Sequence, residues 1–336
     1  MTCDKRSDGP EITIQSVRLK DFNPPGLEVD DGNDAESDID PFLTSPIERD
    51  QSVKEVDRPL HPGEKYFLPT DKAELARLDL QHMVWTRALD GDLFKAPLIG
   101  PKCVLDVGTG TGIWAVDFAK DHPDTEVLGI DLGKPSPPGI PSNCKFEQKD
   151  FTEDWGHTNT FDLVHCRMLF SAKHDARQLL QQAYDSLAPG GYLECQEMYG
   201  MPLDVDGSLS GTTLESFFFN GVLGLKRRGN TSVLSLPLYG QWMREIGFED
   251  VAEVHRALPI NGWPGGAYKA VGEMMLPNIR AGLGGVYTRL FANGLGWSTE
   301  EADEMVRKAS EQMSDRSIHA YFPAFIFYGR KPLSAA

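Results

Sequence analysis

Residues 103–114 read CVLDVGTGTGIW, an apolar run followed by glycines at every second position and then by the opening of a helix pattern. The apolar run predicts a buried strand. Gly108, Gly110 and Gly112 predict a sharp turn that brings backbone N–H groups close to a ligand. A helix that begins at such a turn favours polar or negatively charged ligand groups at its N-terminus. The stretch therefore predicts a site for a nucleotide-like cofactor.

The glycine spacing and a carboxylate further along the chain narrow the class of cofactor. A dinucleotide-binding turn has the pattern G-x-G-x-x-G/A, but the position three after Gly110 is Ile113. The pattern present is G-x-G-x-G, which resembles the first motif of class I S-adenosylmethionine (SAM) methyltransferases. Nineteen residues after Gly112, the apolar run 126–131 ends in Asp131. A carboxylate at that place can accept hydrogen bonds from both ribose hydroxyls.

The composition limits the class of protein. The chain has 336 residues, of which 40% are hydrophobic, enough for a large core. No apolar run reaches about 18 residues and none follows Met1, so we expect neither a membrane span nor a secretory signal. Cys103, Cys166 and Cys195 fall in expected buried strands, which favours reduced thiols in a cytoplasmic or nuclear protein.

The charge argues against nucleic acid as the main partner. The net charge is −17, whereas phosphate binding needs a basic face. The one dense basic cluster, Lys226–Arg228, is more simply a solvated helix end than a binding patch or a localisation signal.

Residues 1–62 are expected to form an acidic, disordered tail. The run 28–40 is too acidic and too poor in apolar residues to offset its ordering entropy. Residues 1–65 hold 16 acidic and 8 basic side chains. A solubilising tail is the simplest role, with a partner-binding arm or a segment phosphorylated at Ser45 as the alternative. Residues 63–332 are predicted to form one domain.

Within this domain the apolar pattern alternates between strands and helices, which predicts a parallel sheet with helices on both faces. The expected strands are 102–107, 126–131, 144–148, 160–166 and 191–197, and the expected helices are 112–121 and 175–187. A helix capped by Thr70 or Asp71 is expected to run to about Leu89. Gln81 and His82, on this helix, either lean over the cofactor or face solvent.

The alternation is interrupted twice, by insertions after strands five and six. Residues 198–236 contain an aromatic helix-like run, and residues 261–315 end in an amphipathic helix after Ser298. A helix and two strands resume the sheet, at 237–247, 248–257 and 319–329. Ligands bind at the carboxyl ends of the strands in such sheets, so both insertions are expected to form a lid there. The link 132–141 holds four prolines and can hardly be a helix.

Several blocks of the chain are similar to one family, the fungal LaeA-like methyltransferases, which belong to the class I SAM-dependent group. The blocks are residues 66–69, 77–82, 103–114, 187–193, 295–298 and 317–321. The resemblance covers roughly residues 63–332. It implies an α/β fold with a Rossmann-like seven-stranded sheet whose last strand is antiparallel, and SAM as cofactor. Members resemble both cluster enzymes that methylate small molecules and secondary-metabolism regulators that associate with velvet-type proteins.

The cofactor-binding residues follow from the glycine turn and from the fold that the resemblance implies. In that fold Asp150 meets the adenine amino group and Phe151 packs on the ring, with an ordinary turn carboxylate as the alternative for Asp150. Arg167, after the fourth strand, is expected to orient an anionic group or the cofactor carboxylate. The full set expected to bind SAM is Asp106, Gly108, Thr109, Gly110, Gly112, Asp131, Leu132, Asp150, Phe151 and Arg167.

Methyl transfer from a sulfonium is an in-line displacement, so the enzyme mainly aligns donor and acceptor in a dry pocket. A general base is needed only if the acceptor must lose a proton. The candidate catalytic residues, near the ends of strands four and five, are Glu197, His174 and Arg167. A solvated loop residue or a helix cap is the simpler explanation for each. No Cys/His cluster or H-E-x-x-H motif is present, so we expect no metal.

The sequence thus predicts a metal-independent methyltransferase that acts on an O, N or C atom of a small secondary metabolite. One alternative is a SAM-binding regulator that acts through velvet-type or other transcriptional partners. Another is a protein that uses SAM structurally in a rearrangement without methyl transfer. The sequence specifies neither the acceptor atom nor the oligomeric state, and lysine, arginine or histidine side chains of proteins remain among the acceptors.

Overall fold

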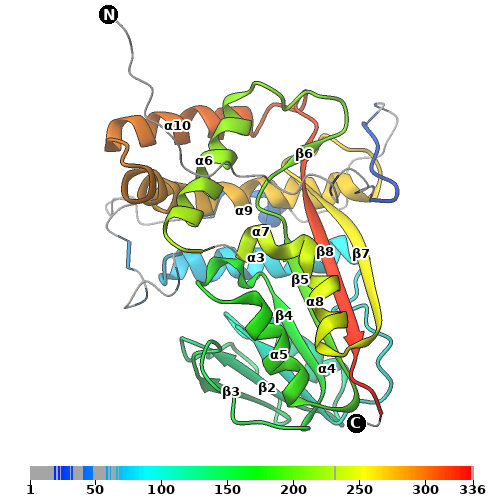
Figure 1. Cartoon of the computed structure of the whole chain (residues 1–336). Helices are drawn as coiled ribbons and strands as arrows, with labels where there is room; N and C mark the ends of the chain where they lie inside the picture. The colour runs from blue at the N-terminus through cyan, green and yellow to red at the C-terminus, as the bar shows by residue number, and fades with distance from the viewer. Residues whose placement is uncertain are drawn as a thin grey trace, which may run out of the picture.

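A computed structural model of the chain describes residues 68–230 and 232–333 continuously, and before them residues 19, 22, 24–30, 32, 41–47, 58–59, 61 and 66. One sheet runs through the molecule (Figure 1). Its strands are β1 (Cys103–Val107), β2 (Glu126–Asp131), β3 (Cys144–Gln148), β4 (Phe161–Arg167), β5 (Leu187–Met198), β6 (Leu203–Asp204), β7 (Glu249–Pro259) and β8 (Ala320–Arg330).

The strand order is β3-β2-β1-β4-β5-β8, with β7 on the far side of β8. The first five strands are parallel, and β8 runs antiparallel to both β5 and β7. Tyr321 of β8 pairs with β7 on one side and with the two-residue β6 on the other, so β6 continues the line of β5. The predicted seven-stranded width and antiparallel last strand are confirmed.

Helices flank the sheet and extend beyond it (Figure 1). They are α2 (Pro41–Thr44), α3 (Lys72–Ala88), α4 (Ile113–Asp121), α5 (Ala176–Ser186), α6 (Thr213–Arg227), α7 (Ser232–Ser235), α8 (Tyr239–Ile246), α9 (Ala267–Arg289) and α10 (Thr299–Gln312). Shorter turns are η3 (Leu169–Ser171), η4 (Leu236–Leu238) and the π-helical η5 (Leu290–Leu295). In the described ranges no helix combines the length and the apolar character that crossing a membrane requires.

Two helix starts follow directly from their capping residues. The Asp71 carboxylate accepts a hydrogen bond from the Glu74 N–H at 2.9 Å, as expected for the beginning of α3. Ser298 and Glu301 form a reciprocal capping box at the beginning of α10. The expected absence of a helix between β2 and β3 is also confirmed, because residues 132–141 contain turns, bends and irregular backbone but no helix.

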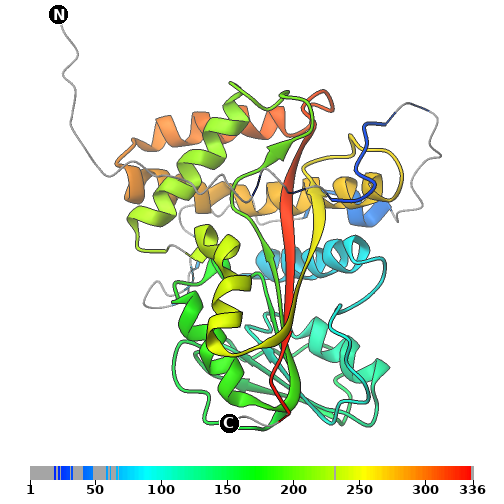
Figure 2. The same ribbon diagram turned by 45° about the vertical axis from the view of Figure 1, so that its right-hand side comes forward.

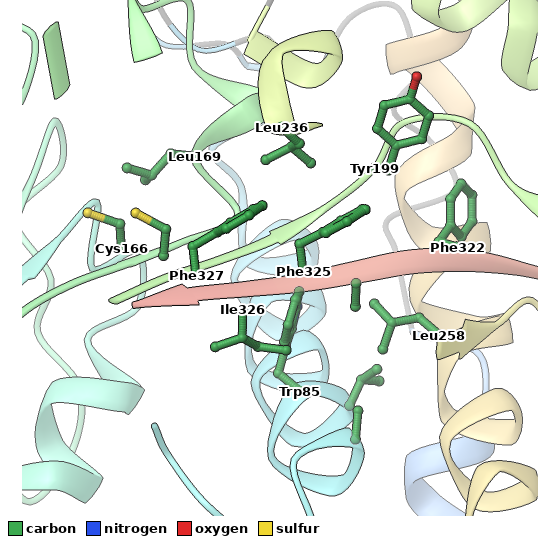
Figure 3. Packing of buried hydrophobic residues seen from close by; sticks show 14 of the residues in the cluster. Trp85, Cys166, Leu169, Tyr199, Leu236, Leu258, Phe322, Phe325, Ile326 and Phe327 are labelled. Carbon is green, nitrogen blue, oxygen red and sulfur yellow. The ribbon is translucent and has the colours of Figure 1, made fainter. Parts of the chain in front are cut away.

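Alternate residues of the strands pack on opposite faces of the sheet, which divides the core into two layers. Figure 3 shows Phe325 and Phe327 of β8 on one face and Ile326 directed towards Trp85 of α3 on the other. The two phenylalanine rings stack with their centroids 5.7 Å apart. Trp85, Ile326 and Phe327 are completely buried, so β8 lies in the middle of the core.

Helices α6, α9 and α10 form a further layer beyond the carboxyl ends of the parallel strands (Figures 1 and 2). They lie in the two chain segments predicted as insertions. Helix α9 packs against α3 and α10, and α10 packs against α6. This layer and the sheet edge below it face each other across the site.

The predicted disorder of residues 1–62 falls largely on residues outside the described part. Those that are described contact the domain. Phe22 is 7% exposed and its ring stacks on that of His255 with centroids 4.5 Å apart. The Asp30 carboxylate binds the Lys269 ammonium at 2.9 Å. At these described residues the segment packs against the domain through one buried ring and one ion pair, while a disordered tail stays a prediction for the rest.

Candidate active site

A cavity of about 1000 Å³ lies between the sheet edge and the helical layer. Its walls come from the turns after β1, β2, β3 and β4, from α3, and from α6, α9 and β8. Of the residues predicted to bind the cofactor, it is lined by Gly108, Gly110, Asp131, Leu132, Phe151 and Arg167. Among the described residues no group of three or more metal-ligating side chains could hold a metal ion.

The glycine turn has the backbone conformation that its sequence predicts. Gly108, Gly110 and Gly112 all have positive φ, at 64°, 59° and 85°. A Cβ at Gly112 would lie 2.6 Å from Cζ of Phe146, and a Cβ at Gly108 would overlap the Leu169 side chain. Glycine is therefore required both by the left-handed conformation and by the space. Gly112 meets Phe146 and does not line the cavity, so its role is to shape the turn.

Asp131 ends β2 with its carboxylate at the cavity wall. Its Oδ2 accepts a hydrogen bond from the Gly110 N–H at 2.9 Å, and its Oδ1 accepts one from the Gly133 N–H at 3.0 Å. Burial raises the pKa of this carboxyl, while the two N–H donors oppose the increase by stabilising its charge. The two backbone donors fix the orientation of the carboxylate before a ligand arrives.

Asp106 and Thr109 were also predicted to bind the cofactor, but their side chains do not line the cavity. Asp106 accepts a hydrogen bond from the Thr109 hydroxyl at 2.5 Å and one from Nδ1 of His165 at 2.8 Å. His165 stacks on Trp114 with ring centroids 3.7 Å apart. Asp106 is 3% exposed and Thr109 is 8% exposed. These two residues hold the turn from behind, whereas the sequence predicted a direct contact with the cofactor.

Asp150 and Phe151 differ in their place at the site. Asp150 accepts hydrogen bonds from the N–H and the hydroxyl of Thr152, at 2.9 and 2.7 Å, and does not line the cavity. The alternative of an ordinary turn carboxylate describes it better than a contact to adenine. Phe151 lines the cavity, and its ring meets the edge of His174.

Arg167 reaches the cavity wall from the end of β4 and is held by a residue of α3. Its Nη2 donates to Nδ1 of His82 at 2.9 Å, and Nε2 of His82 lies 3.2 Å from the Asp117 carboxylate. Because arginine has only donors, Nδ1 of His82 accepts and Nε2 carries the proton. Burial lowers the pKa of His82, consistent with this neutral ring.

The charge of Arg167 is therefore balanced by no directly bonded carboxylate among the described residues. Burial lowers its pKa to about 10, so the guanidinium is still charged at neutral pH. His82 neither leans over the cavity nor faces solvent, while its neighbour Gln81 does line the cavity. A buried cation with a neutral partner attracts an anionic ligand group.

Glu197 and His174 were predicted as catalytic residues, and neither lines the cavity. Glu197 is 2% exposed, and its Oε1 accepts a hydrogen bond from the Leu169 N–H at 2.8 Å. His174 donates from Nδ1 to the Ala172 carbonyl oxygen at 2.9 Å. Both side chains bind the loop after β4 from behind. Of the three predicted catalytic residues, Arg167 is therefore the one whose side chain lines the cavity.

The sequence predicted a lid at the other end of the cavity but not the side chains that line it. It is lined by apolar side chains of the helical layer, together with a buried ion pair of α3. Arg77 donates to both carboxylate oxygens of Glu74, at 2.7 and 2.9 Å, and the two residues are 5% and 1% exposed. Asn278 of α9 donates to the Arg77 carbonyl oxygen at 3.0 Å and thereby ties α9 to α3. The three-residue spacing of Glu74 and Arg77 on one helix was the only local signal of this pair.

Comparison with known proteins assigns the family. Residues 84–253 match a family described as "Methyltransferase domain". The chain is 33% identical to "Methyltransferase pytC" of Aspergillus terreus over 275 residues, 81% of this chain and 85% of that protein. It is 30% identical to "Secondary metabolism regulator LAE1" of Cochliobolus heterostrophus over 80% of this chain and 90% of that protein.

A further relative is "Protein-methionine methyltransferase laeA" of Emericella nidulans, 28% identical over 88% of this chain and 80% of that protein. The turn with no room for a Cβ, the oriented carboxylate of Asp131 and the cationic Arg167 fit the polar groups of SAM. The chain belongs to the methyltransferase family, as a LaeA-like class I enzyme that depends on SAM.

Proposed function

We propose that this enzyme transfers a methyl group from SAM to a small secondary metabolite, and that the acceptor binds at the apolar end of the cavity. The observation that carries the proposal is the continuity of one cavity from the glycine turn to the helical layer. A volume of about 1000 Å³ is at the upper limit for a pocket with a single drug-sized ligand, which leaves space for donor and acceptor together.

We assign the cofactor contacts to the residues that line the polar end. Asp131 would accept hydrogen bonds from the ribose hydroxyls, and the backbone at Gly108 and Gly110 would approach the cofactor closely. Arg167 would bind the cofactor carboxylate, because its guanidinium is a buried cation at the cavity wall with no directly bonded carboxylate among the described residues. Phe151 and Leu132 would pack against the adenine.

The chemistry needs alignment more than it needs a base. When bound, SAM supplies a methyl group on a sulfonium, which an acceptor atom takes by in-line displacement while the electron pair of the broken bond stays on sulfur. Glu197 and His174 lie behind the loop after β4, so we infer that a hydroxyl acceptor releases its proton to water. The walls contribute by orienting the acceptor and excluding other water.

The first test is calorimetric titration of SAM into the wild-type protein and into Asp131→Ala. We expect the substitution to weaken binding by roughly 10- to 100-fold, because the ribose loses charge-assisted hydrogen bonds. Asp150→Ala is the control, because the Asp150 carboxylate accepts hydrogen bonds from Thr152 and does not line the cavity. This substitution should change the affinity for SAM by less than about threefold. Equal affinity of wild type and Asp131→Ala, with both folded, would contradict the cofactor assignment.

A second candidate function is regulation. The relative from Cochliobolus heterostrophus is named a secondary metabolism regulator, and the N-terminal acidic segment could join a transcriptional partner of the velvet type. A regulator of transcription would act in the nucleus, whereas an enzyme that methylates a metabolite would work in either the cytoplasm or the nucleus. Stable co-purification with such a partner, lost when residues 33–40 are replaced by a neutral sequence, would support it.

The name of the laeA relative suggests another candidate reaction, the methylation of a methionine side chain in a protein. Intact-mass measurement of the chain after incubation with SAM addresses this directly. We expect no mass gain of a methyl group if the acceptor is a small molecule. A gain that maps to one of the chain's own methionines would replace our proposal.

A further inference from the structure

The apolar end of the cavity has the composition of a protein core. We call it the acceptor chamber and define it by Phe218, Val222, Leu225, Met275, Leu290 and Phe322. These side chains come from α6, α9, η5 and β8, and each is at most 7% exposed. An ion that enters such surroundings loses its hydration without gaining polar partners, at a cost of several kcal/mol on the order of that found for buried ions.

The two most deeply buried charges of α3 at the cavity neutralise each other. Three charged side chains of α3 line the cavity; Arg77 and Glu74 are joined by two hydrogen bonds, and the third is Asp79. Nδ2 of Asn278 donates to the Arg77 carbonyl oxygen, and Oδ1 of Asn278 accepts a hydrogen bond from Nη1 of Arg77 at 3.4 Å. A charged acceptor would therefore gain no free counter-ion from the Arg77–Glu74 pair, while the polar end of the cavity keeps Arg167 for the cofactor.

Tyr287 supplies the hydroxyl of this chamber. Its ring lies against Phe217, with centroids 4.3 Å apart, and against Phe291 at 5.9 Å. Gly221 makes this position possible, because a Cβ there would be 2.5 Å from Cε1 of Tyr287. Tyr287 lines the cavity, and within the described chain its hydroxyl has no hydrogen-bond partner. Burial raises the pKa of Tyr287, so the hydroxyl stays protonated and can donate.

From this geometry we infer the class of acceptor: a neutral, mainly apolar small molecule with one oxygen function, which accepts a hydrogen bond from the Tyr287 hydroxyl. This inference rests on the proposed function and narrows it. Lysine, arginine and carboxylate acceptors are excluded by the desolvation that the acceptor chamber imposes. Tyr287 acts here as a binding residue that sets the orientation of the oxygen and hence which atom faces the methyl group.

Three naphthalene probes of similar size test the inference: 2-naphthol, the anion 2-naphthoate, and naphthalene itself. Binding is measured by fluorescence titration at neutral pH with the protein saturated with S-adenosylhomocysteine. We expect 2-naphthol to bind at least about tenfold more tightly than 2-naphthoate, because only the anion loses the hydration of a charge. Tyr287→Phe should weaken 2-naphthol by roughly 3- to 10-fold and leave naphthalene unchanged.

Two controls keep the outcome interpretable. Tyr328→Phe removes a hydroxyl from β8 outside the cavity and should leave all three affinities unchanged. Val222→Trp fills the acceptor chamber and should abolish binding of 2-naphthol and of naphthalene while S-adenosylhomocysteine still binds.

Three results would overturn the inference. They are 2-naphthoate binding as tightly as 2-naphthol, Tyr287→Phe weakening naphthalene and 2-naphthol equally, and no probe binding to protein that binds S-adenosylhomocysteine. Failure of S-adenosylhomocysteine itself to bind would instead contradict the proposed function. The experiment therefore distinguishes a wrong acceptor class from a wrong function.

Discussion

Replacing Glu197 with glutamine is expected to remove a pH dependence from the stability of the fold. The Glu197 carboxyl is 2% exposed and accepts the Leu169 N–H at 2.8 Å, while its Oε2 is buried without a hydrogen-bond partner in the described chain. Burial raises its pKa from an ordinary value of 4.5 to about 8. Glutamine has the shape of the protonated acid and cannot ionise, so the variant keeps the contact to Leu169.

The sign and size follow from proton linkage. Between about pH 4.5 and pH 8 the folded state holds a proton on Glu197 that the unfolded state has lost. The stabilisation is therefore complete below about pH 4.5 and disappears as the pH rises to about 8. A pKa difference of about 3.5 pH units corresponds to a loss of about 5 kcal/mol at most, at about 1.4 kcal/mol per unit.

Urea unfolding at pH 5, 6.5 and 8 measures this loss. The wild-type free energy of unfolding should fall steeply with pH, whereas that of Glu197→Gln should fall much less, so that the variant is the more stable protein at pH 8. Replacement of the exposed Glu147 by glutamine serves as the control, and it should leave the dependence of the free energy of unfolding on pH as in the wild type. Parallel curves for wild type and Glu197→Gln would refute the reasoning, because they would show that Glu197 is ionised in both states.

Two further substitutions test the packing around the site. Gly112→Ala should destabilise the fold by more than Gly139→Ala, as measured by thermal unfolding: both residues have positive φ, but only at Gly112 would a Cβ meet a ring, 2.6 Å from Phe146. Equal losses would show that Phe146 moves aside. Arg77→Met should lower the free energy of unfolding by about 3–5 kcal/mol, because it leaves Glu74 buried and unpaired. The double variant with Glu74→Leu should recover much of this loss in urea unfolding, and a double variant as unstable as the single one would refute the explanation.

Local pattern was enough to predict most of the sheet. The bounds predicted for β2 and β3 coincide with those observed, and those of β1 and β4 differ by one residue. Apolar runs, glycine turns and proline links act over a few residues, which is the range of sequence reasoning. The same local signals identified Asp131 and Arg167 at the cavity wall, because each is the last residue of a strand in the parallel part of the sheet.

What the sequence could not predict at the site is the direction of the side chains. Asp106 lies within β1, and its side chain turns to His165 on the neighbouring β4, a register that the sequence does not contain. Glu197 comes at the correct end of β5, but its carboxylate meets the backbone at Leu169. Their positions along the chain were right, while their partners depend on strand pairing.

Contacts between distant parts of the chain were missed for a related reason. Arg167 and His82 are separated by 85 residues, and Arg77 and Asn278 by 201. Each pair forms only after α3 has docked on the sheet and on α9. Periodicity describes which face of a helix is apolar, and it contains no information on which distant residue meets that face.

The place of β8 has a consequence for biosynthesis. This strand is the last of the described elements, yet it lies between β5 and β7 and carries Phe322, Phe325 and Phe327 into the core. Until it emerges from the ribosome, both flanking strands present open edges and an apolar gap. The sheet can therefore be completed only once β8 has been synthesised, and a premature stop shortly before Ala320 leaves nearly all of the preceding chain as a target for aggregation and proteolysis.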